Sequence, residues 1–429
     1  MVRQTFFWSL LLLFLISPVV GQIPQIELRS ESSIRKHADI YFERHAFSHA
    51  AKLYHKLIVR NPEDIQIQYR LGDCYRFLRE PISASFWYGK ALKTDNSNPE
   101  YMLHYAAVLC ASRKYQLAKH WYQAYLEVSP NDQRAVNALA SLTESQDLFD
   151  TRYEARLLDI ELPGDVFSPA FLDSGLVFVG EGNTNSIVKK ITTWQEGPYF
   201  DLYFVPLNSK GQPGYPKYFD NQLNSVFHEG PVIFYDQGRK AILTRSNYKR
   251  GEEDTRNLQL MIAERNPNGS WGSPRKLFHH PDYSIGHPAI NSEGNIIYFS
   301  SNKPGGFGGT DIYRSELVDG QWQEPVNAGP EINTAGNELF PSLDMHGVLY
   351  FSSDGHGGLG GLEILQVDPT HAASPKNLGH PINSQGDDFG IVWTPGENSG
   401  YFSTDRTGRD RIYQFKEHLQ LVKAAVPDN

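Results

Sequence analysis

The apolar positions of the chain follow two different periods in its two halves. From residue 31 to about residue 147 they recur at helical spacing, and the whole pattern repeats every 34 residues. A helix-turn-helix unit of this length buries its apolar face only against the next copy, so the period predicts a stack of helix pairs. Three columns of the repeat are constant in type: Ala38, Gly72 and Ala106; Ala50, Ala84 and Ala118; Tyr54, Tyr88 and Tyr122.

The ends of the helical repeat units are also marked. Pro62 and Pro130 lie two periods apart, where a proline would end the second helix of a unit. Residues 134–142 have a further helical pattern, which we interpret as a capping helix. The columns and the period together resemble the tetratricopeptide repeat, and we assign residues 30–147 to such an array. The resemblance implies a concave face that binds a partner; a spacer or a dimer contact is the alternative.

From residue 150 to residue 416 the pattern changes to short strands. Five units each open on a strand with a small residue or proline, continue through a glycine turn into a β-branched or aromatic strand, and then reach a third strand. A fourth strand leads to the next unit. Four antiparallel strands repeated in this way predict a β-propeller. The five openings are Ser168–Ala170, Gly230–Val232, His287–Ala289, Phe340–Ser342 and Phe389–Ile391.

The fold class that follows is a helical solenoid joined to a five-bladed β-propeller. A sixth blade stays open as an alternative, because the first two units are long enough to contain another sheet. The last unit stops after its third strand, near Phe415. Residues 156–162 could supply its outer strand, which would close the ring and leave no free sheet edge.

The first residues have the features of a targeting segment. Arg3 precedes an apolar run over residues 6–20, and small residues follow before Gln22. The run is shorter than the roughly 20 residues that span a bilayer, so we interpret residues 1–21 as a cleaved signal peptide rather than a membrane anchor. We therefore expect an exported protein, in the periplasm or associated with the outer membrane, with no transmembrane segment after cleavage. Residues 417–429 form a C-terminal tail.

Charge and cysteine content narrow the classes of function. The chain of 429 residues has a net charge of −9 and no basic run, which argues against nucleic acid as a partner. Cys74 and Cys110 fall on helical core positions, so we expect buried free thiols, with a disulfide between them as the alternative. No His-Glu-x-x-His or Cys-x-x-Cys motif occurs, and we expect neither a metal nor another cofactor.

Candidate binding residues follow from the strand directions. Because the second strand of a blade returns antiparallel to the first, the start of strand one and the end of strand two lie on the same propeller face. The glycine-rich stretches 305–309 and 357–361 belong to this face. It would form a polar mouth for a peptide, glycan or partner loop; alternatively, its polar groups only cap strand ends and turns. The residues that it collects are His228, Glu229, Arg245, His287, Asn302, Glu338, Asp354, Asp387, Asp388 and Asp405.

An enzymatic alternative uses the same face. Five-bladed glycosidases place two carboxylates across the channel mouth, and Glu338 with Asp387 or Glu229 could act in this way. No Gly-x-Ser-x-Gly nucleophile motif is present, and no hydrolase domain accompanies the propeller. We therefore expect a binding protein with no catalytic residues.

The strand motif resembles a known group of propellers. Phe299–Asn302, Gly305–Gly309 and Asp311–Tyr313 are similar to the pattern of WD-repeat-like, TolB-type propellers in Bacteroidetes envelope proteins. Tetratricopeptide repeats followed by such a propeller resemble the PorE-like proteins of the type IX secretion system. The resemblance implies an interaction scaffold whose partners are envelope proteins, among them outer-membrane secretion subunits. A glycan- or peptide-binding propeller unconnected to secretion is the alternative.

The resemblance is incomplete. PorE-like proteins also have a carboxypeptidase-regulatory-like domain and a peptidoglycan-binding OmpA-like domain, and neither is found within these 429 residues. Anchoring to the cell wall is therefore not expected of this sequence.

Overall fold

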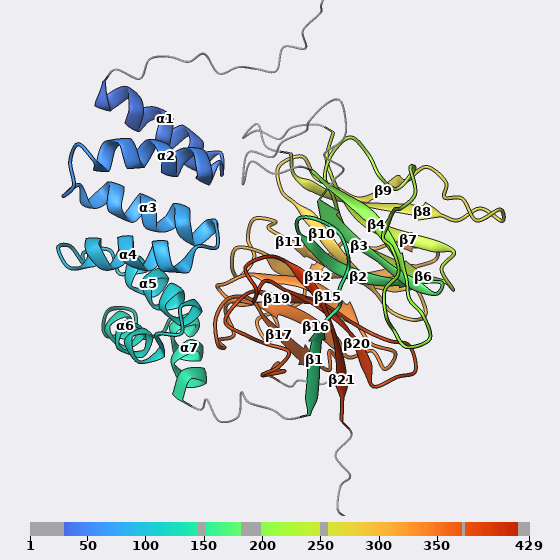
Figure 1. Cartoon of the computed structure of the whole chain (residues 1–429). Helices are drawn as coiled ribbons and strands as arrows, with labels where there is room; N and C mark the ends of the chain where they lie inside the picture. The colour runs from blue at the N-terminus through green and yellow to red at the C-terminus, as the bar shows by residue number, and fades with distance from the viewer. Residues whose placement is uncertain (1–29, 144–151, 182–198, 249–255, 371–373, 419–429) are drawn as a thin grey trace, which may run out of the picture.

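The computed structural model describes residues 30–143, 152–181, 199–248, 256–370 and 374–418. Within them, a stack of helices lies beside a ring of β-sheets (Figure 1). The expected signal peptide at 1–21 and nearly all of the expected tail at 417–429 fall outside the described residues. The fold class is the predicted one: a helical array of the tetratricopeptide type followed by a five-bladed propeller.

Seven helices form the array, as three antiparallel pairs and one further helix. The last helix, α7, covers the region predicted to cap the array. No helix within the described residues is long and apolar enough to cross a membrane. The helices are α1 (Glu31–Glu43), α2 (Phe47–Ile58), α3 (Ile65–Phe77), α4 (Pro81–Leu92), α5 (Glu100–Ala111), α6 (Tyr115–Val128) and α7 (Gln133–Thr143).

The constant columns of the repeat form the core of the array. The alanine and tyrosine columns are buried, and Gly72 lies so close to the Tyr88 ring that a Cβ there would be 2.6 Å from it. The hydroxyl of Tyr88 donates to Asp73 at 2.6 Å, and one repeat earlier that of Tyr54 donates to Asp39 at 2.7 Å. Two of the three repeats therefore share a Tyr–Asp hydrogen bond as well as an apolar contact; the third has Ala107 in place of the aspartate.

Both cysteines are buried free thiols in this core, as expected. Burial raises the pKa of the Cys110 thiol to about 12, so the group is a poor nucleophile at neutral pH.

Five sheets form the ring, and each blade has its innermost strand first in the chain. Blade 1 contains β2 (Val166–Leu172), β3 (Gly175–Glu181), β4 (Phe200–Pro206) and β5 (Lys217–Tyr218). Blade 2 contains β6 (Glu229–Tyr235), β7 (Lys240–Ser246), β8 (Leu258–Glu264) and β9 (Arg275–Phe278). Blade 3 contains β10 (Ile285–Ile290), β11 (Ile296–Ser301), β12 (Asp311–Val318), β13 (Gln321–Trp322) and β14 (Val326–Asn327).

The last two blades complete the circle. Blade 4 contains β15 (Glu338–Leu343), β16 (Leu349–Ser353), β17 (Glu363–Val367) and β18 (Lys376–Asn377). Blade 5 contains β19 (Asp388–Trp393), β20 (Ser399–Thr404), β21 (Arg411–Glu417) and, as its outer strand, β1 (Tyr153–Leu157).

Closure of the ring by the strand before blade 1 is therefore confirmed, but its position differs from the prediction. The closing strand pairs Tyr153 with Glu417 and ends at Leu157, so it lies earlier than residues 156–162. Tyr153 is buried against Phe415, which fixes the earlier register. The alternative of a sixth blade receives no support within the described residues.

The helical array contacts the propeller on the face where the first strands begin. Arg113, in the α5–α6 turn, donates to Gln385 at 3.0 Å. Asn137 of α7 donates to the carbonyl of Gly355 at 3.1 Å. This is the face for which the sequence predicted a binding mouth, and here its first contact is with the protein's own helices.

Candidate functional site

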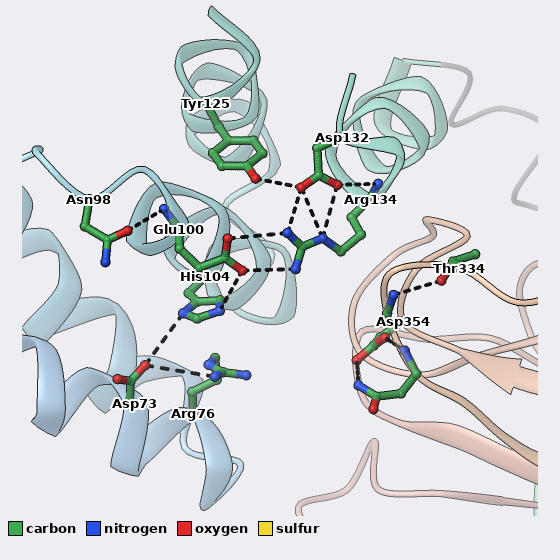
Figure 2. Close-up of polar contacts among 12 residues, drawn as sticks. Asp73, Arg76, Asn98, Glu100, His104, Tyr125, Asp132, Arg134, Thr334 and Asp354 are labelled. Atoms are coloured by element: carbon green, nitrogen blue, oxygen red, sulfur yellow. Dashed lines mark hydrogen bonds and ion pairs between the residues drawn. The ribbon is translucent and has the colours of Figure 1, made fainter. Parts of the chain in front are cut away.

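A cleft of about 1120 Å³ lies between the helical array and the propeller. One wall consists of α3, α5, α7 and the helix-helix turns. The other consists of loops from blades 3 to 5 together with residues of blade 1. Figure 2 shows polar side chains of the helical array beside the propeller loop that contains Asp354. Because both domains form this cleft, we take it as the candidate site.

A continuous polar chain crosses the helical wall (Figure 2). His104 lies between two carboxylates, with Nδ1 at 3.6 Å from Asp73 and Nε2 at 3.6 Å from Glu100. The guanidinium of Arg134 lies 3.0 Å from the Glu100 carboxylate and 2.6 Å from the Asp132 carboxylate, so it links these two residues. Burial lowers the pKa of His104 although both carboxylates act in the opposite direction. A neutral imidazole within an ion-pair network can accept or donate a hydrogen bond to a ligand.

The propeller wall is acidic, and Arg79 extends into it from the α3–α4 turn. Its guanidinium lies 3.0 Å from Asp387, 2.7 Å from Asp410 and 3.7 Å from Asp405. Burial, and then the charge of Asp387, raise the pKa of Asp405 to about 7. Burial also raises the pKa of Asp410 to about 6. Burial acts to lower the pKa of Arg79, but the three carboxylates outweigh it and raise that pKa.

The two glycine-rich loops differ in what covers them. In blade 4, a Cβ on Gly357 would lie 2.6 Å from the backbone of Asn137, so glycine allows α7 to approach. In blade 3, the equivalent Gly305 has nothing within 4 Å of that point. The apolar residues at the two loop tips differ in the same way. Leu359 of the blade 4 loop is 3% exposed, whereas Phe307 of the blade 3 loop is 49% exposed. The array therefore covers the blade 4 loop and leaves the blade 3 loop open.

Of the ten residues predicted for the binding mouth, Asp354, Asp387 and Asp405 line the cleft. Asp354 accepts from the backbone N–H and the side-chain amide of Asn337, at 2.6 and 3.0 Å. One oxygen of Asp387 accepts from the Leu362 N–H at 2.9 Å, and the other faces Arg79. The structure thus brings these three together on one wall.

Four of the other predicted residues are buried and form ion pairs or hydrogen bonds that fix the loops between blades. Glu229 and Arg245 form a buried ion pair at 2.9 Å. Glu338 accepts from the hydroxyls of Thr334 and Ser353, both at 2.7 Å. Asp388 is also buried; it accepts from the Ser384 hydroxyl and pairs with Arg406, each at 2.8 Å.

These carboxylates belong to a repeated motif that the sequence reasoning missed. An apolar residue, Asn, then Ser or Thr precede each carboxylate at a constant spacing, and the Asn side chain bonds both backbone groups of a residue in the third strand. Asn383, for example, accepts from the N–H of Ile364 at 2.8 Å and donates to its carbonyl at 2.9 Å. The three copies are Leu223–Ser225 with Glu229, Ile332–Thr334 with Glu338, and Ile382–Ser384 with Asp388.

The remaining three predicted residues lie in blades 2 and 3, outside the cleft. The His287 ring stacks on Phe340 with 4.0 Å between centroids, and burial lowers its pKa to about 4. His228 accepts from the Phe200 N–H at 3.2 Å, and burial lowers its pKa to about 4 as well. Asn302 accepts from the Ser284 N–H at 2.7 Å. Each of these side chains stabilises local structure.

A Glu338→Gln variant should reveal the burial of this carboxyl through pH-dependent stability. Burial raises the pKa of Glu338 from 4.5 to about 7, so between these values the folded protein keeps a proton that the unfolded chain releases. Raising the pH through this window therefore lowers the unfolding free energy of the wild type. Glutamine does not titrate, so the variant lacks this part of the pH dependence. The wild-type melting temperature should fall by roughly 5 to 10 °C relative to the variant between pH 5 and pH 8.

The control for this experiment is Glu331→Gln, at an exposed carboxylate of the same blade junction. It should follow the wild type at every pH. Parallel melting curves for Glu338→Gln and the wild type would show that the Glu338 pKa is not raised.

The cleft also contains residues that sequence reasoning missed. Arg79 and Arg113 occupy the same repeat position as His45, and all three have a positive φ of 57° or 58° in the turn between paired helices. Their spacing of 34 residues was visible in the sequence. The sequence could not show that two of these turns face the propeller.

Within the described residues, no group of three or more His, Cys, Asp or Glu side chains could hold a metal ion. The cleft instead offers hydrogen-bonding side chains of both charges and the exposed backbone of several glycines. Such a surface suits an extended polar segment, whose own backbone needs donors and acceptors.

No protein-family model and no curated protein sequence matches the chain. Among solved structures, the helical array is similar to the first TPR domain of Spaghetti (RPAP3), solved with an HSP90 peptide. The identity is 20% and the TM-score 0.25, over 27% of this chain and 93% of that chain.

The propeller is similar to CoXyl43, a GH43 β-xylosidase/α-arabinofuranosidase from a compost microbial metagenome. The identity is 10% and the TM-score 0.40, over 62% of this chain and 94% of that chain. A puromycin-hydrolyzing peptidase of Mycobacterium tuberculosis matches with 14% identity and a TM-score of 0.33, over 59% of this chain and 35% of that chain. At these values the assignment of function rests on the site itself.

Proposed function

We propose that this protein is a non-enzymatic interaction scaffold that binds an extended segment of a partner protein in the cleft between its two domains. The observation that carries the proposal is the cleft of about 1120 Å³ whose walls come from both repeat domains. Repeat arrays present extended binding surfaces of this kind. His104 and Arg134 on one wall, and the glycine backbone on the other, supply the polar contacts that such a segment needs.

The state of the carboxylates favours binding over hydrolysis. A glycosidase needs one carboxyl as acid and another as base or nucleophile, both facing the substrate. Glu338 and Glu229 are buried and bonded within their own blades. Asp387 faces the guanidinium of Arg79 at 3.0 Å. Asp387 lines the cleft, but neither Glu338 nor Glu229 lies there with it as the second carboxyl group that a glycosidase needs.

We further propose that the protein works in the cell envelope, in the periplasm or at the outer membrane, as part of a type IX secretion or gliding-type complex. The support is the sequence: an N-terminal segment like a signal peptide, and tetratricopeptide repeats followed by a propeller with PorE-like motifs. Its partners would then be outer-membrane subunits of that machinery.

Site-specific photo-cross-linking tests both proposals. A benzoylphenylalanine at Ala107 or Ala138, which line the cleft, should cross-link a partner in envelope preparations. The same group at Val128, exposed at the end of α6, is the control. Cross-links specific to the cleft positions support a cleft-binding scaffold, and secretion-system subunits among the products support the envelope role. Equal labelling from Val128, or none from the cleft, would contradict cleft binding.

A further inference from the structure

The turns between paired helices form the part of the array that reaches the propeller. His45, Arg79 and Arg113 occupy the same place in three successive repeats and share the same left-handed backbone conformation. This common geometry directs the side chains of Arg79 and Arg113 towards blade 5 and the loop before it. Among the described residues, Arg113 donates there to the neutral amide of Gln385, at 3.0 Å, whereas Arg79 pairs with carboxylates.

The carboxylates around Arg79 come from three separate places in blade 5. Asp387 precedes β19, Asp405 follows β20, and Asp410 precedes β21. Asp410 is the most enclosed of the three, with 10% of its side chain exposed, and its N–H donates to Asp165 at 3.2 Å. Asp405 accepts from the N–H of Asp387 at 2.8 Å, so the acidic groups are held close together whether or not Arg79 is present.

The energetic role of Arg79 follows from this crowding. At pH 8, above the raised pKa values of Asp405 and Asp410, the three carboxylates repel one another, and a single guanidinium within 4 Å of all of them offsets the repulsion. The nearby Arg406 is already committed to Asp388, at 2.8 Å. The attraction between the domains at this point therefore depends on Arg79, whose side chain remains 41% exposed and open to screening by salt.

We infer that Arg79 is an electrostatic latch that holds the helical array against blade 5 and so sets the width of the interdomain cleft. The inference rests on the proposed function in one respect: the cleft that the latch controls is the binding site proposed above. With the latch formed, the cleft has its volume of about 1120 Å³ and three of its carboxylates are paired with Arg79. When the latch is released, the array moves away and the cleft admits a partner segment. The two domains would thus regulate access to their shared site.

Fluorescence transfer in the full-length chain tests the latch without any partner. A donor and an acceptor on Val59→Cys of the array and Val326→Cys of blade 3 report the separation of the domains, because both positions are exposed and the native cysteines are buried. In otherwise wild-type protein, transfer should fall as NaCl rises from about 50 mM to about 500 mM, because screening weakens the pairs. Arg79→Ala should show the low transfer of the high-salt state already at low salt, with little further change.

Arg113→Ala is the matched control, since it removes an equivalent arginine that has a neutral partner. It should keep the transfer and the salt response of the wild type. Arg79→Lys, which keeps the charge, should lie between wild type and alanine, and it provides the test if Arg79→Ala does not fold. Unchanged transfer in these Arg79 variants, or an equal effect of Arg113→Ala, would overturn the latch. The readout needs no ligand, so failure of the proposed binding function would appear separately, in the cross-linking experiment.

Discussion

Replacing Gly357 by valine is expected to separate the helical array from the propeller. Gly357 has a φ of +78°, and a Cβ there would lie 2.6 Å from the carbonyl carbon and oxygen of Asn137. Backbone atoms cannot rotate away as a side chain can, so α7 must move. We expect loss of the Asn137–Gly355 hydrogen bond and a larger radius of gyration in solution scattering.

The chain provides a matched control for this substitution. Gly305 occupies the equivalent position of the blade 3 loop, with a φ of +90° and nothing within 4 Å of its Cβ position. Gly305→Val should therefore suffer only the backbone strain, about 1 to 2 kcal/mol, and remain compact. If Gly305→Val expands the protein as much as Gly357→Val does, close packing of the blade 4 loop on α7 does not contribute to holding the domains together.

Replacing Asn383 by leucine is expected to cause a large loss of propeller stability. Leucine is similar in size, but it leaves the buried N–H of Ile364 without its partner. It also removes the bonds that the Asn383 amide donates to the Ile364 carbonyl, which still accepts from the Leu378 N–H at 3.1 Å, and to Asn377. One unsatisfied buried N–H and the two further hydrogen bonds lost from the Asn383 amide cost roughly 3 to 4 kcal/mol together. Thermal unfolding should show a melting temperature lower by about 10 °C.

An exposed asparagine gives the comparison for this experiment. Asn268 accepts from Ser270 in a surface turn, and Asn268→Leu should change the unfolding free energy by no more than about 0.5 kcal/mol. If Asn383→Leu lowers the unfolding free energy by less than about 1 kcal/mol, the repeated Asn motif does not stabilise the blades.

Much of the fold could be predicted because residue types that recur at a fixed spacing mark the positions that are buried between successive copies of a repeat. The columns of Ala50 and Tyr54 repeat only where each copy packs against the next, and so they located the helical array. The strand that closes the ring was predicted for a similar reason, since the last unit had only three strands. Its predicted bounds, residues 156–162, were too late in the chain, because the contact of Tyr153 with Phe415 is between residues far apart in the sequence.

The candidate site could be predicted only in part. The strand directions placed Asp387 and Glu338 on the same face, but polarity alone does not distinguish a carboxylate that lines a cleft from one that is buried and bonded. Similarly, Gly305 and Gly357 are equivalent in sequence, and only the docked helix α7 makes their surroundings different. The position of Arg79 depends on how two independent repeats meet, and neither repeat pattern contains that information.

The central claim is that the helical array and the propeller dock to form one shared cleft. Cysteine cross-linking tests it most directly, with Arg113→Cys paired with Gln385→Cys, because the native side chains are in contact at 3.0 Å. Arg113→Cys paired with Asn302→Cys, on the blade 3 part of the same face, is the control. We predict that a short bifunctional maleimide will join the first pair much faster than the second within one chain. Equal rates for the two pairs would contradict the docked arrangement.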